Sequence, residues 1–211
     1  TINIGGGQKE ILPGSKFTRP SIREDSYYVT SMIIVSKFML EWNEKLEFFV
    51  RSSEKSICPV CQQSLKVIGS RRRTVINEEG DKMILIIRRL RCINEACNKI
   101  HHELPDIITP YKRQTTSSIE KIIVEEADTV PVENSTIKRI REWFRRKADA
   151  IAGGLLSTYV TVKQDYEVGL SDLPQSILQR IFFFVGHSPG WLKKVVRILV
   201  NNNRWPHTQL A

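Results

Sequence analysis

Four cysteines are the residues whose type and spacing most directly indicate chemistry in this chain of 211 residues. Cys58 and Cys61 are separated by two residues, Cys92 and Cys97 by four, and thirty residues lie between the pairs. Each pair can form a tight turn that directs two thiolates to one point. Four thiolates complete the tetrahedral coordination of zinc and leave no position for water. The spacing therefore predicts one structural Zn²⁺ and not a catalytic metal.

Two other interpretations of the cysteines stay open. Iron in a rubredoxin-like site would suit the same four thiolates, although the aromatic and acidic surroundings of an electron carrier are missing near the pairs. His101 and His102 follow Cys97 closely and could replace one cysteine, although four available thiolates favour their being ordinary strand residues. Disulfide bonds are disfavoured in an intracellular chain.

The segment between the cysteine pairs is expected to bring them together. Residues 67–76 and 83–91 have the composition of strands, and the Asn, Asp and Gly residues of 77–81 are typical of a turn. A hairpin of this kind places both pairs at one end. Metal binding would then supply folding free energy that so small a core cannot provide.

Arginines flank the predicted turn on both strands. Arg71, Arg72 and Arg73 precede it, while Arg88, Arg89 and Arg91 lie on the returning strand. In an extended strand Arg89 and Arg91 share one face and Arg88 lies on the other. These side chains either contact phosphates or form a solvated edge that discourages strand aggregation. The acidic residues in the turn weaken the first interpretation.

A basic helix is predicted from residue 135 to 152, capped by Asn134 and ended by Gly153 and Gly154. Its apolar stripe contains Ile137, Ile140, Phe144, Ala148 and Ile151. The cations Lys138, Arg139, Arg145 and Arg146 lie outside the stripe, and Arg141 at its border. A shorter helix over 116–127 and a turn with Pro131 precede it, so the pair resembles a helix-turn-helix. The alternative is a surface helix made soluble by charge.

The remaining chain completes an α+β fold class, a small β zinc ribbon followed by a helix-turn-helix region and C-terminal helices. Residues 32–50 predict two short strands, or a strand and a short helix. One later helix is expected from near Pro174 to Gly186, and another from a Ser188 cap with Pro189 first to about Val200. The expected division is a weakly ordered 1–31, a ribbon domain 32–113, a helix-turn-helix 114–154 and a helical region 155–211.

Charge and composition restrict the function classes. The formal net charge is +9, and residues 51–113 and 135–150 carry most of it, which favours nucleic acid as a partner. No segment has the length of a membrane span or the pattern of a secretory signal, so a cytoplasmic, nucleoid-associated protein is expected. No Gly-rich phosphate loop or Ser/His/Asp pattern indicates an enzyme or a small-molecule substrate.

Several segments together resemble the N-terminal zinc ribbon of bacterial insertion-sequence transposases. They are Cys58-Pro59-Val60-Cys61, the Arg88–Cys92 run, Cys97, His102-Glu103-Leu104-Pro105-Asp106 and Pro110-Tyr111-Lys112-Arg113. The chain is similar over residues 32–211 to an uncharacterised Firmicutes family found near mobile-element genes. The resemblance implies recognition of DNA ends or target sites. It implies no catalysis, because Asp165, Glu167 and Asp172 lie too close together for a transposase's three carboxylates.

The sequence therefore predicts a sequence-specific or structure-specific DNA-binding protein that acts on double-stranded DNA as an accessory or regulatory factor of a mobile element. Its predicted contacts come from the hairpin, the segment after it and the basic helix: Arg71, Arg72, Arg73, Arg88, Arg89, Arg91, Lys112, Arg113, Ser135, Thr136, Lys138, Arg139, Arg141, Arg145 and Arg146. The first alternative is an adaptor that docks onto a transposase or polymerase complex. The second is an RNA-binding ribbon.

Overall fold

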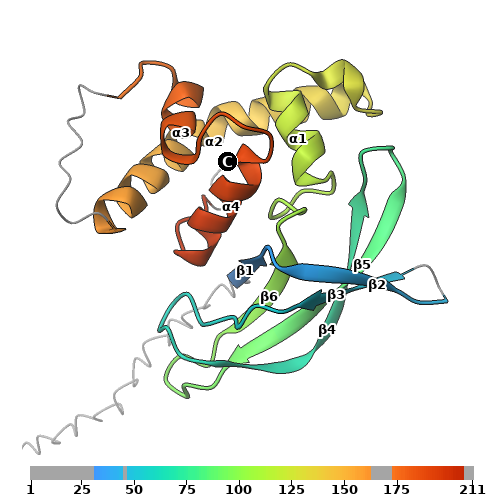
Figure 1. Cartoon of the computed structure of the whole chain (residues 1–211), viewed down its shortest axis with the longest axis vertical. Helices are drawn as coiled ribbons and strands as arrows, with labels where there is room; N and C mark the ends of the chain where they lie inside the picture. Colours follow the sequence, from blue (N-terminus) through green and yellow to red (C-terminus); the bar gives the residue numbers. More distant parts are fainter. Residues whose placement is uncertain (1–30, 45–46, 163–172, 207–211) are drawn as a thin grey trace, which may run out of the picture.

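The computed structural model describes residues 31–44, 47–162 and 173–206 (Figure 1). Within them the chain forms a curled mixed sheet at one end and four helices at the other, which confirms the α+β class. The predicted N-terminal extension lies outside the described residues except for Ser31. None of the described helices is long and apolar enough to cross a membrane.

Six strands build the sheet: β1 Ser31–Val35, β2 Phe38–Trp42, β3 Glu47–Ser52, β4 Leu65–Ile76, β5 Lys82–Cys92 and β6 Ile100–Pro105. The long β5 is its axis. One edge of β5 pairs antiparallel with β4 over the full hairpin, while the other edge is shared by parallel β3 and antiparallel β6. β1 follows β6, and β2 follows β3. The strands expected in 32–50 therefore join the sheet of the predicted hairpin.

The hairpin turn has the chemistry that its sequence indicates. The Asn77 N–H donates to the Asp81 carbonyl at 2.9 Å, and the Asp81 N–H donates to Asn77 Oδ1 at 2.6 Å. Gly80 has φ +91°, a conformation that residues with a Cβ rarely adopt. The turn packs on the helical layer, because a Cβ at Gly80 would lie 3.2 Å from Pro131 Cγ. The hairpin therefore reaches from the cysteine end of the molecule to the helices (Figure 1).

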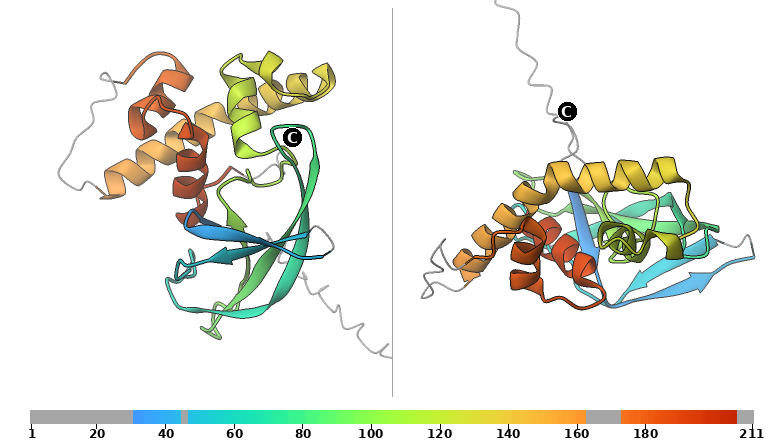
Figure 2. Two further views of the ribbon diagram at one scale, coloured as in Figure 1. Left: turned by 45° about the vertical axis from the view of Figure 1, so that its right-hand side comes forward. Right: turned by 90° about the horizontal axis from the view of Figure 1, so that it is seen from above.

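The helical layer contains α1 Thr116–Ile123, the short 3₁₀ helix η1 Ala127–Thr129, α2 Asn134–Val162, α3 Ile177–Val185 and α4 Trp191–Asn201. Figure 2 shows α2 as a long helix that runs past α1 and on to α3. Buried residues of the sheet and of the helices form one hydrophobic cluster, from Ile34 and Leu85 to Ile119, Ile151 and Leu199. The segments that the sequence divides into domains thus share a core.

α2 is longer than predicted, because Gly153 and Gly154 do not end it and it continues to Val162. Glycine inside a helix costs only about 1 kcal/mol, and tertiary packing outweighs that cost here. A Cβ on Gly154 would lie 2.9 Å from Leu199 Cδ2 of α4, so the missing side chain permits the close crossing of the two helices. The start also differs by one residue: Asn134 is the first residue of the helix and not its cap.

The predicted start of α4 is wrong, because the helix begins at Trp191 after Gly190 and not at a Ser188 cap. A buried carboxylate from α1 takes the capping role instead. Glu120 accepts the Gly190 N–H at 2.6 Å and the Leu192 N–H at 2.9 Å. Negative charge at a helix N-terminus satisfies open N–H groups and opposes the helix dipole favourably. The predicted end of α3 at Gly186 is confirmed.

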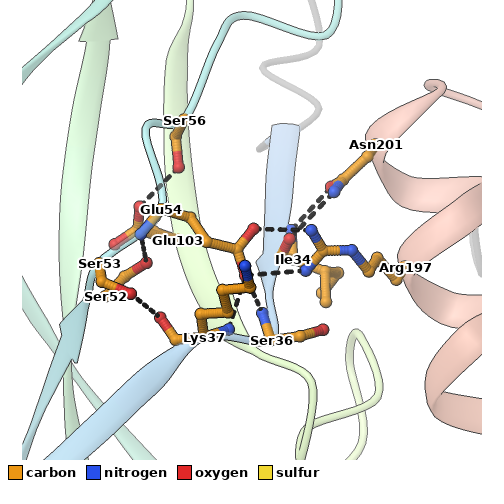
Figure 3. A network of polar contacts seen from close by, with 10 residues as sticks. All are labelled: Ile34, Ser36, Lys37, Ser52, Ser53, Glu54, Ser56, Glu103, Arg197 and Asn201. Carbon is orange, nitrogen blue, oxygen red and sulfur yellow. Dashed lines mark hydrogen bonds and ion pairs between the residues drawn. The ribbon is translucent and has the colours of Figure 1, made fainter.

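Polar side chains fasten α4 to the sheet, as Figure 3 shows. Arg197 forms two bonds to the Glu54 carboxylate, at 3.0 and 2.6 Å, and Glu54 also accepts the N–H groups of Ser36 and Lys37. The Asn201 amide exchanges two hydrogen bonds with the main chain of Ile34, at 2.8 and 2.9 Å. Side chains of α4 thereby satisfy groups along β1 and fix the helical layer to the sheet.

Candidate metal centre and basic surface

The four predicted cysteines meet at one point. Their sulfur atoms all lie within 4.8 Å of one another. Cys58 Sγ is 3.7 Å from Cys97 Sγ, and Cys61 Sγ is 3.4 Å from Cys92 Sγ. Each close contact joins one cysteine of the first pair to one of the second. The cluster can therefore hold a metal ion, as the spacing predicts.

Both cysteine turns share a backbone device that aims N–H groups at sulfur. The residue after the second cysteine of each turn has positive φ, +60° at Gln62 and +43° at Asn98. The N–H groups of Val60 and Cys61 point at Cys58 Sγ, and that of Gln63 points at Cys61 Sγ. Such donors stabilise thiolates and metal-bound sulfur.

The thiols differ in their electrostatics. Burial raises the pKa of Cys58 and raises that of Cys92 to about 12. The backbone N–H of Gln63 is the main cause that lowers the pKa of Cys61 to about 7. Two buried thiols therefore resist deprotonation without a cation, whereas a bound metal would deprotonate all four.

The two histidines near the cysteines lie on opposite faces of β6. His101 is fully buried, and its Nε2 lies 3.3 Å from Cys58 Sγ. This places the ring beside a sulfur, as a hydrogen-bonding neighbour of the cluster. His102 faces away and pairs across the sheet with Arg89. The four sulfurs form the cluster without either ring.

The cysteine cluster closes the open end of the β4–β5 hairpin. Cys61 lies just before β4, Cys92 ends β5, and Cys97 lies just before β6. The Ile93 N–H donates to the Ser64 carbonyl, and the Cys92 N–H to the Lys99 carbonyl. The cluster therefore fixes the strands that carry the predicted arginines.

One face of the hairpin, here called the paired face, holds its arginines against carboxylates. Arg88 binds Glu103 through two bonds, at 2.5 and 2.9 Å, and Ser56 donates to the same carboxylate at 2.7 Å. Glu103 is only 1% exposed. Arg72 lies 2.8 Å from Glu47. Two of the predicted DNA contacts, Arg72 and Arg88, are thus paired with carboxylates of the protein itself.

The opposite face, here called the open face, carries Arg71, Arg73, Arg89 and Arg91. The strand register places them on one side, as alternation predicts for Arg89 and Arg91. On this side Arg71 and Arg73 of β4 lie opposite the core residues Ile87 and Leu85 of β5, whereas Arg89 and Arg91 lie nearer the cysteines. Among the described residues, no carboxylate lies within 4.0 Å of these four arginines.

Burial and crowded positive charge together lower pKa values on the open face. Burial, then Arg71 and Arg113, lowers the pKa of Arg73. Burial, then Arg71, Arg89 and Arg73, lowers the pKa of His102. The Nε atoms of Arg73 and Arg91 are buried and have no partner within the described structure. Cations held together at this cost are typical of a surface that binds an anion.

The segment between β6 and α1 continues the open face toward α2. Arg73 donates from its guanidinium to the Lys112 carbonyl at 2.8 Å. The Lys112 ammonium lies over the Trp143 ring of α2, 4.2 Å from its centroid. Burial, then Arg146 and Arg139, lowers the pKa of Lys112 to about 8. Lys112 therefore links the arginines of the hairpin to those of the helix.

The helical cations lie as the predicted stripe requires, with Ile140, Ala148 and Ile151 buried on the opposite side. Arg141 donates to the Ile122 carbonyl at the end of α1, and Glu142 pairs with Arg145 and, at 3.6 Å, with Arg146. A shallow surface cavity of about 470 Å³ is lined by Asn134, Ile137, Lys138, Arg141, Glu142 and Arg145. Ser135 is exposed in the first turn, and Thr136 is half-buried and accepts from Arg139.

The connection between α1 and α2 is ten residues long, from 124 to 133, and contains η1. This is longer than the three to four residues usual in a helix-turn-helix. Glu120, Trp143 and Tyr111 were not among the predicted site residues. Trp143 could have been found from its spacing to Ile140 on the apolar stripe, whereas Glu120 is important only through contacts remote in sequence.

Comparison with known families gives a match over part of the chain. Residues 58–140 match a domain of unknown function (DUF6431). This stretch begins at the first cysteine of the cluster and ends in the first part of α2, so it contains the hairpin, the Lys112 segment and the start of the basic helix. No curated protein and no solved structure matches the chain.

Proposed function

We propose that this chain is a zinc-containing DNA-binding protein that acts as an accessory or regulatory factor of a mobile genetic element. The observation that carries the proposal is the open face, where arginines from two strands gather with no carboxylate of the described residues within ion-pair distance. These cations continue through Lys112 to α2. Phosphate contacts from such cations provide most of the sequence-independent affinity for DNA. The mobile-element context rests on the resemblance of the cysteine and arginine segments to transposase ribbons.

Zinc suits the geometry of the cluster. Zinc–sulfur bonds of about 2.3 Å in a tetrahedron place sulfur atoms about 3.8 Å apart, close to the 3.4 and 3.7 Å of the two close sulfur pairs. Four thiolates with no open position make the ion structural. Its role here is to fix the ends of β4, β5 and β6, and through them the spacing of the open-face arginines.

The proposal assigns different roles to the predicted contacts. Arg71, Arg73, Arg89, Arg91, Lys112 and Arg113 would contact phosphates, and Ser135, Thr136, Lys138 and Arg139 would approach base edges from the first turns of α2. Arg145 and Arg146 would contact a second stretch of backbone. Arg72 and Arg88 stabilise the sheet through their ion pairs with Glu47 and Glu103. Arg141 connects α2 to α1 through its bond to the Ile122 carbonyl.

A protein-docking role is the second candidate, because the edge strand β2 exposes apolar side chains. Met39 is 67% exposed and Trp42 is 71% exposed, and Leu40 lies between them. Exposed edge strands with large apolar residues are typical interaction surfaces. Docking at β2 would leave the open face available, so an adaptor that also binds DNA is compatible with both observations.

Two neighbouring arginines of β4 give a matched test of DNA binding. Arg71 and Arg72 are both exposed but lie on opposite faces. Arg71→Ala should weaken duplex DNA binding and reduce the slope of log affinity against log salt by about 0.9, since one phosphate contact is lost. Arg72→Ala should leave both quantities unchanged.

Fluorescence anisotropy with a labelled duplex at two salt concentrations measures both variants, with zinc content determined on the same samples. Equal effects of the two substitutions, or no salt-sensitive binding by the unaltered protein, would overturn the proposal. Competition by structured RNA would show whether RNA and not duplex DNA is the preferred ligand.

A further inference from the structure

Tyr111 has a backbone conformation that tyrosine rarely adopts. Its φ is +63°, in the left-handed region, where a bulky side chain is strained. Glycine or asparagine is the usual residue at such a position. The side chain is nevertheless 40% exposed, so burial of the ring does not account for the choice of residue.

The segment around Tyr111 is held rigidly. The Lys112 N–H donates to the Thr109 carbonyl at 3.1 Å, and the Ile76 N–H donates to the Arg113 carbonyl at 2.7 Å. Pro110 before it is buried, and the Lys112 carbonyl is held by Arg73. The backbone of the strained residue is thus fixed between anchored neighbours.

Cationic residues lie close to Tyr111 in the chain and in the fold. Lys112 and Arg113 are the next two residues of the chain, although the Lys112 ammonium lies over Trp143. Tyr111 is also near enough to Arg73 to act on the pKa of its guanidinium. An exposed aromatic ring among phosphate-binding cations is the arrangement with which proteins hold unpaired bases. The cations hold the backbone, and the ring stacks on the base.

We propose that Tyr111 is a nucleobase-stacking residue, and that the DNA bound by the open face contains a locally unpaired base. A strand end, a bulge or a distorted junction offers such a base, and a continuous duplex does not. This inference rests on the proposed DNA-binding function and sharpens its substrate class. The strain at Tyr111 is then the cost of holding an aromatic ring where an asparagine would fit the backbone better.

The test compares two DNA probes of equal length, one fully paired duplex and one with a single unpaired 2-aminopurine. The unaltered protein should bind the second probe more tightly and quench its fluorescence by stacking. Tyr111→Ala should lower affinity for the unpaired-base probe by about fivefold to a hundredfold and leave the duplex nearly unaffected. Tyr111→Phe keeps the ring and should behave as the unaltered protein.

Tyr111→Asn separates binding from folding. Asparagine tolerates positive φ, so this variant should melt at a higher temperature while losing the preference for the unpaired base. If Tyr111→Asn and Tyr111→Ala keep the preference, or if all variants bind both probes equally, the stacking role is overturned. Failure of the DNA-binding proposal would give a different result, because Arg71→Ala would then leave binding to both probes unchanged.

Discussion

Arginines have different surroundings on the two faces of the β4–β5 hairpin. On the paired face, Arg88 and Arg72 lie against Glu103 and Glu47. On the open face, Arg71, Arg73 and Arg89 have no carboxylate within ion-pair distance in the described structure. Adjacent arginines in the sequence thus fall on surfaces of opposite character, because side chains alternate along a strand.

The difference separates stability from binding within one hairpin. A cation with its own carboxylate gains little from a phosphate, since the local charge is already balanced. A cation crowded by other cations loses repulsion when an anion arrives, and releases counterions from the anion. Substitutions on the paired face should therefore lower stability, whereas substitutions on the open face should weaken DNA binding.

Loss of metal binding at the cysteine cluster should have the largest effect on stability and on DNA binding. The cluster joins the ends of the strands that carry both the paired face and the open face. Cys58→Ser with Cys97→Ser should abolish metal binding and unfold the sheet end, since structural zinc contributes on the order of 10 kcal/mol in small zinc domains. Circular dichroism, melting temperature and metal content measure this loss.

Val60→Ser is the matched control for the cysteine variant, because Val60 lies in the same turn, is exposed and offers no sulfur. It should keep the metal and the melting temperature. A chelated protein that melts at the original temperature would show that the hairpin holds its arginines without an ion.

Arg88 and Arg89 should separate most clearly by stability. Arg88→Met leaves the Glu103 carboxylate buried with Ser56 as its remaining bonded side chain. Breaking a buried ion pair in this way should lower the free energy of unfolding by about 3–5 kcal/mol. Arg89→Met should change the free energy of unfolding by at most about 0.5 kcal/mol but weaken DNA binding. Urea denaturation and anisotropy measure the two quantities.

A second substitution tests the cause of the Arg88 effect. Glu103→Leu in the Arg88→Met background removes the uncompensated charge and should recover part of the stability. If the double variant is as unstable as Arg88→Met, lost packing and not buried charge explains the effect. If Arg89→Met destabilises as much as Arg88→Met, the division into two faces is wrong.

Features decided by neighbours in sequence were predicted well. The cysteine turns, the hairpin with its 77–81 turn and the apolar stripe of α2 follow from spacing and periodicity, and the structure confirms them. Which face each arginine takes also follows from alternation. The DNA contacts themselves stay predictions, since no bound nucleic acid defines them.

Features decided by remote contacts were not predictable from sequence alone. Glu47 and Glu103 lie 25 and 15 positions from the arginines they bind, and nothing local identifies them as partners. Gly154 suggests a helix end in the sequence, but in the structure it leaves room for Leu199 of α4, which a Cβ at this position would contact too closely. Glu120 caps a helix 70 residues away. Each error arises where tertiary contact outweighs local preference.

Acid should weaken the molecule through Glu54, a paired carboxylate outside the hairpin. Bonds from Arg197, then from the Lys37 and Ser36 N–H groups, lower the pKa of Glu54 from 4.5 to about 2. Because the folded pKa lies below the unfolded one, its contribution is complete above about pH 5 and is lost as pH falls toward 2. Glu54→Gln should flatten this acid limb of stability.

The Glu54 effect should be about 1–2 kcal/mol, less than the full pKa difference implies, because Arg197 is 37% exposed and partly screened. Denaturant unfolding between pH 3 and 7 measures it. Glu41→Gln is the control, since Glu41 and Arg51 are both more than half exposed and should contribute little. An unchanged acid limb in Glu54→Gln would assign the acid sensitivity to another carboxylate.

The smallest effect is expected at Arg72, where the paired face meets solvent. Its side chain is 68% exposed, so water screens the attraction to Glu47, which also has Asn43 as a partner. Arg72→Ala should therefore cost at most about 1 kcal/mol in urea denaturation, well below Arg88→Met. Binding to DNA should not change, because Glu47 already balances this cation. A clear loss of affinity without loss of stability would place Arg72 with the DNA-binding cations, and would show that a carboxylate partner does not by itself remove an arginine from that surface.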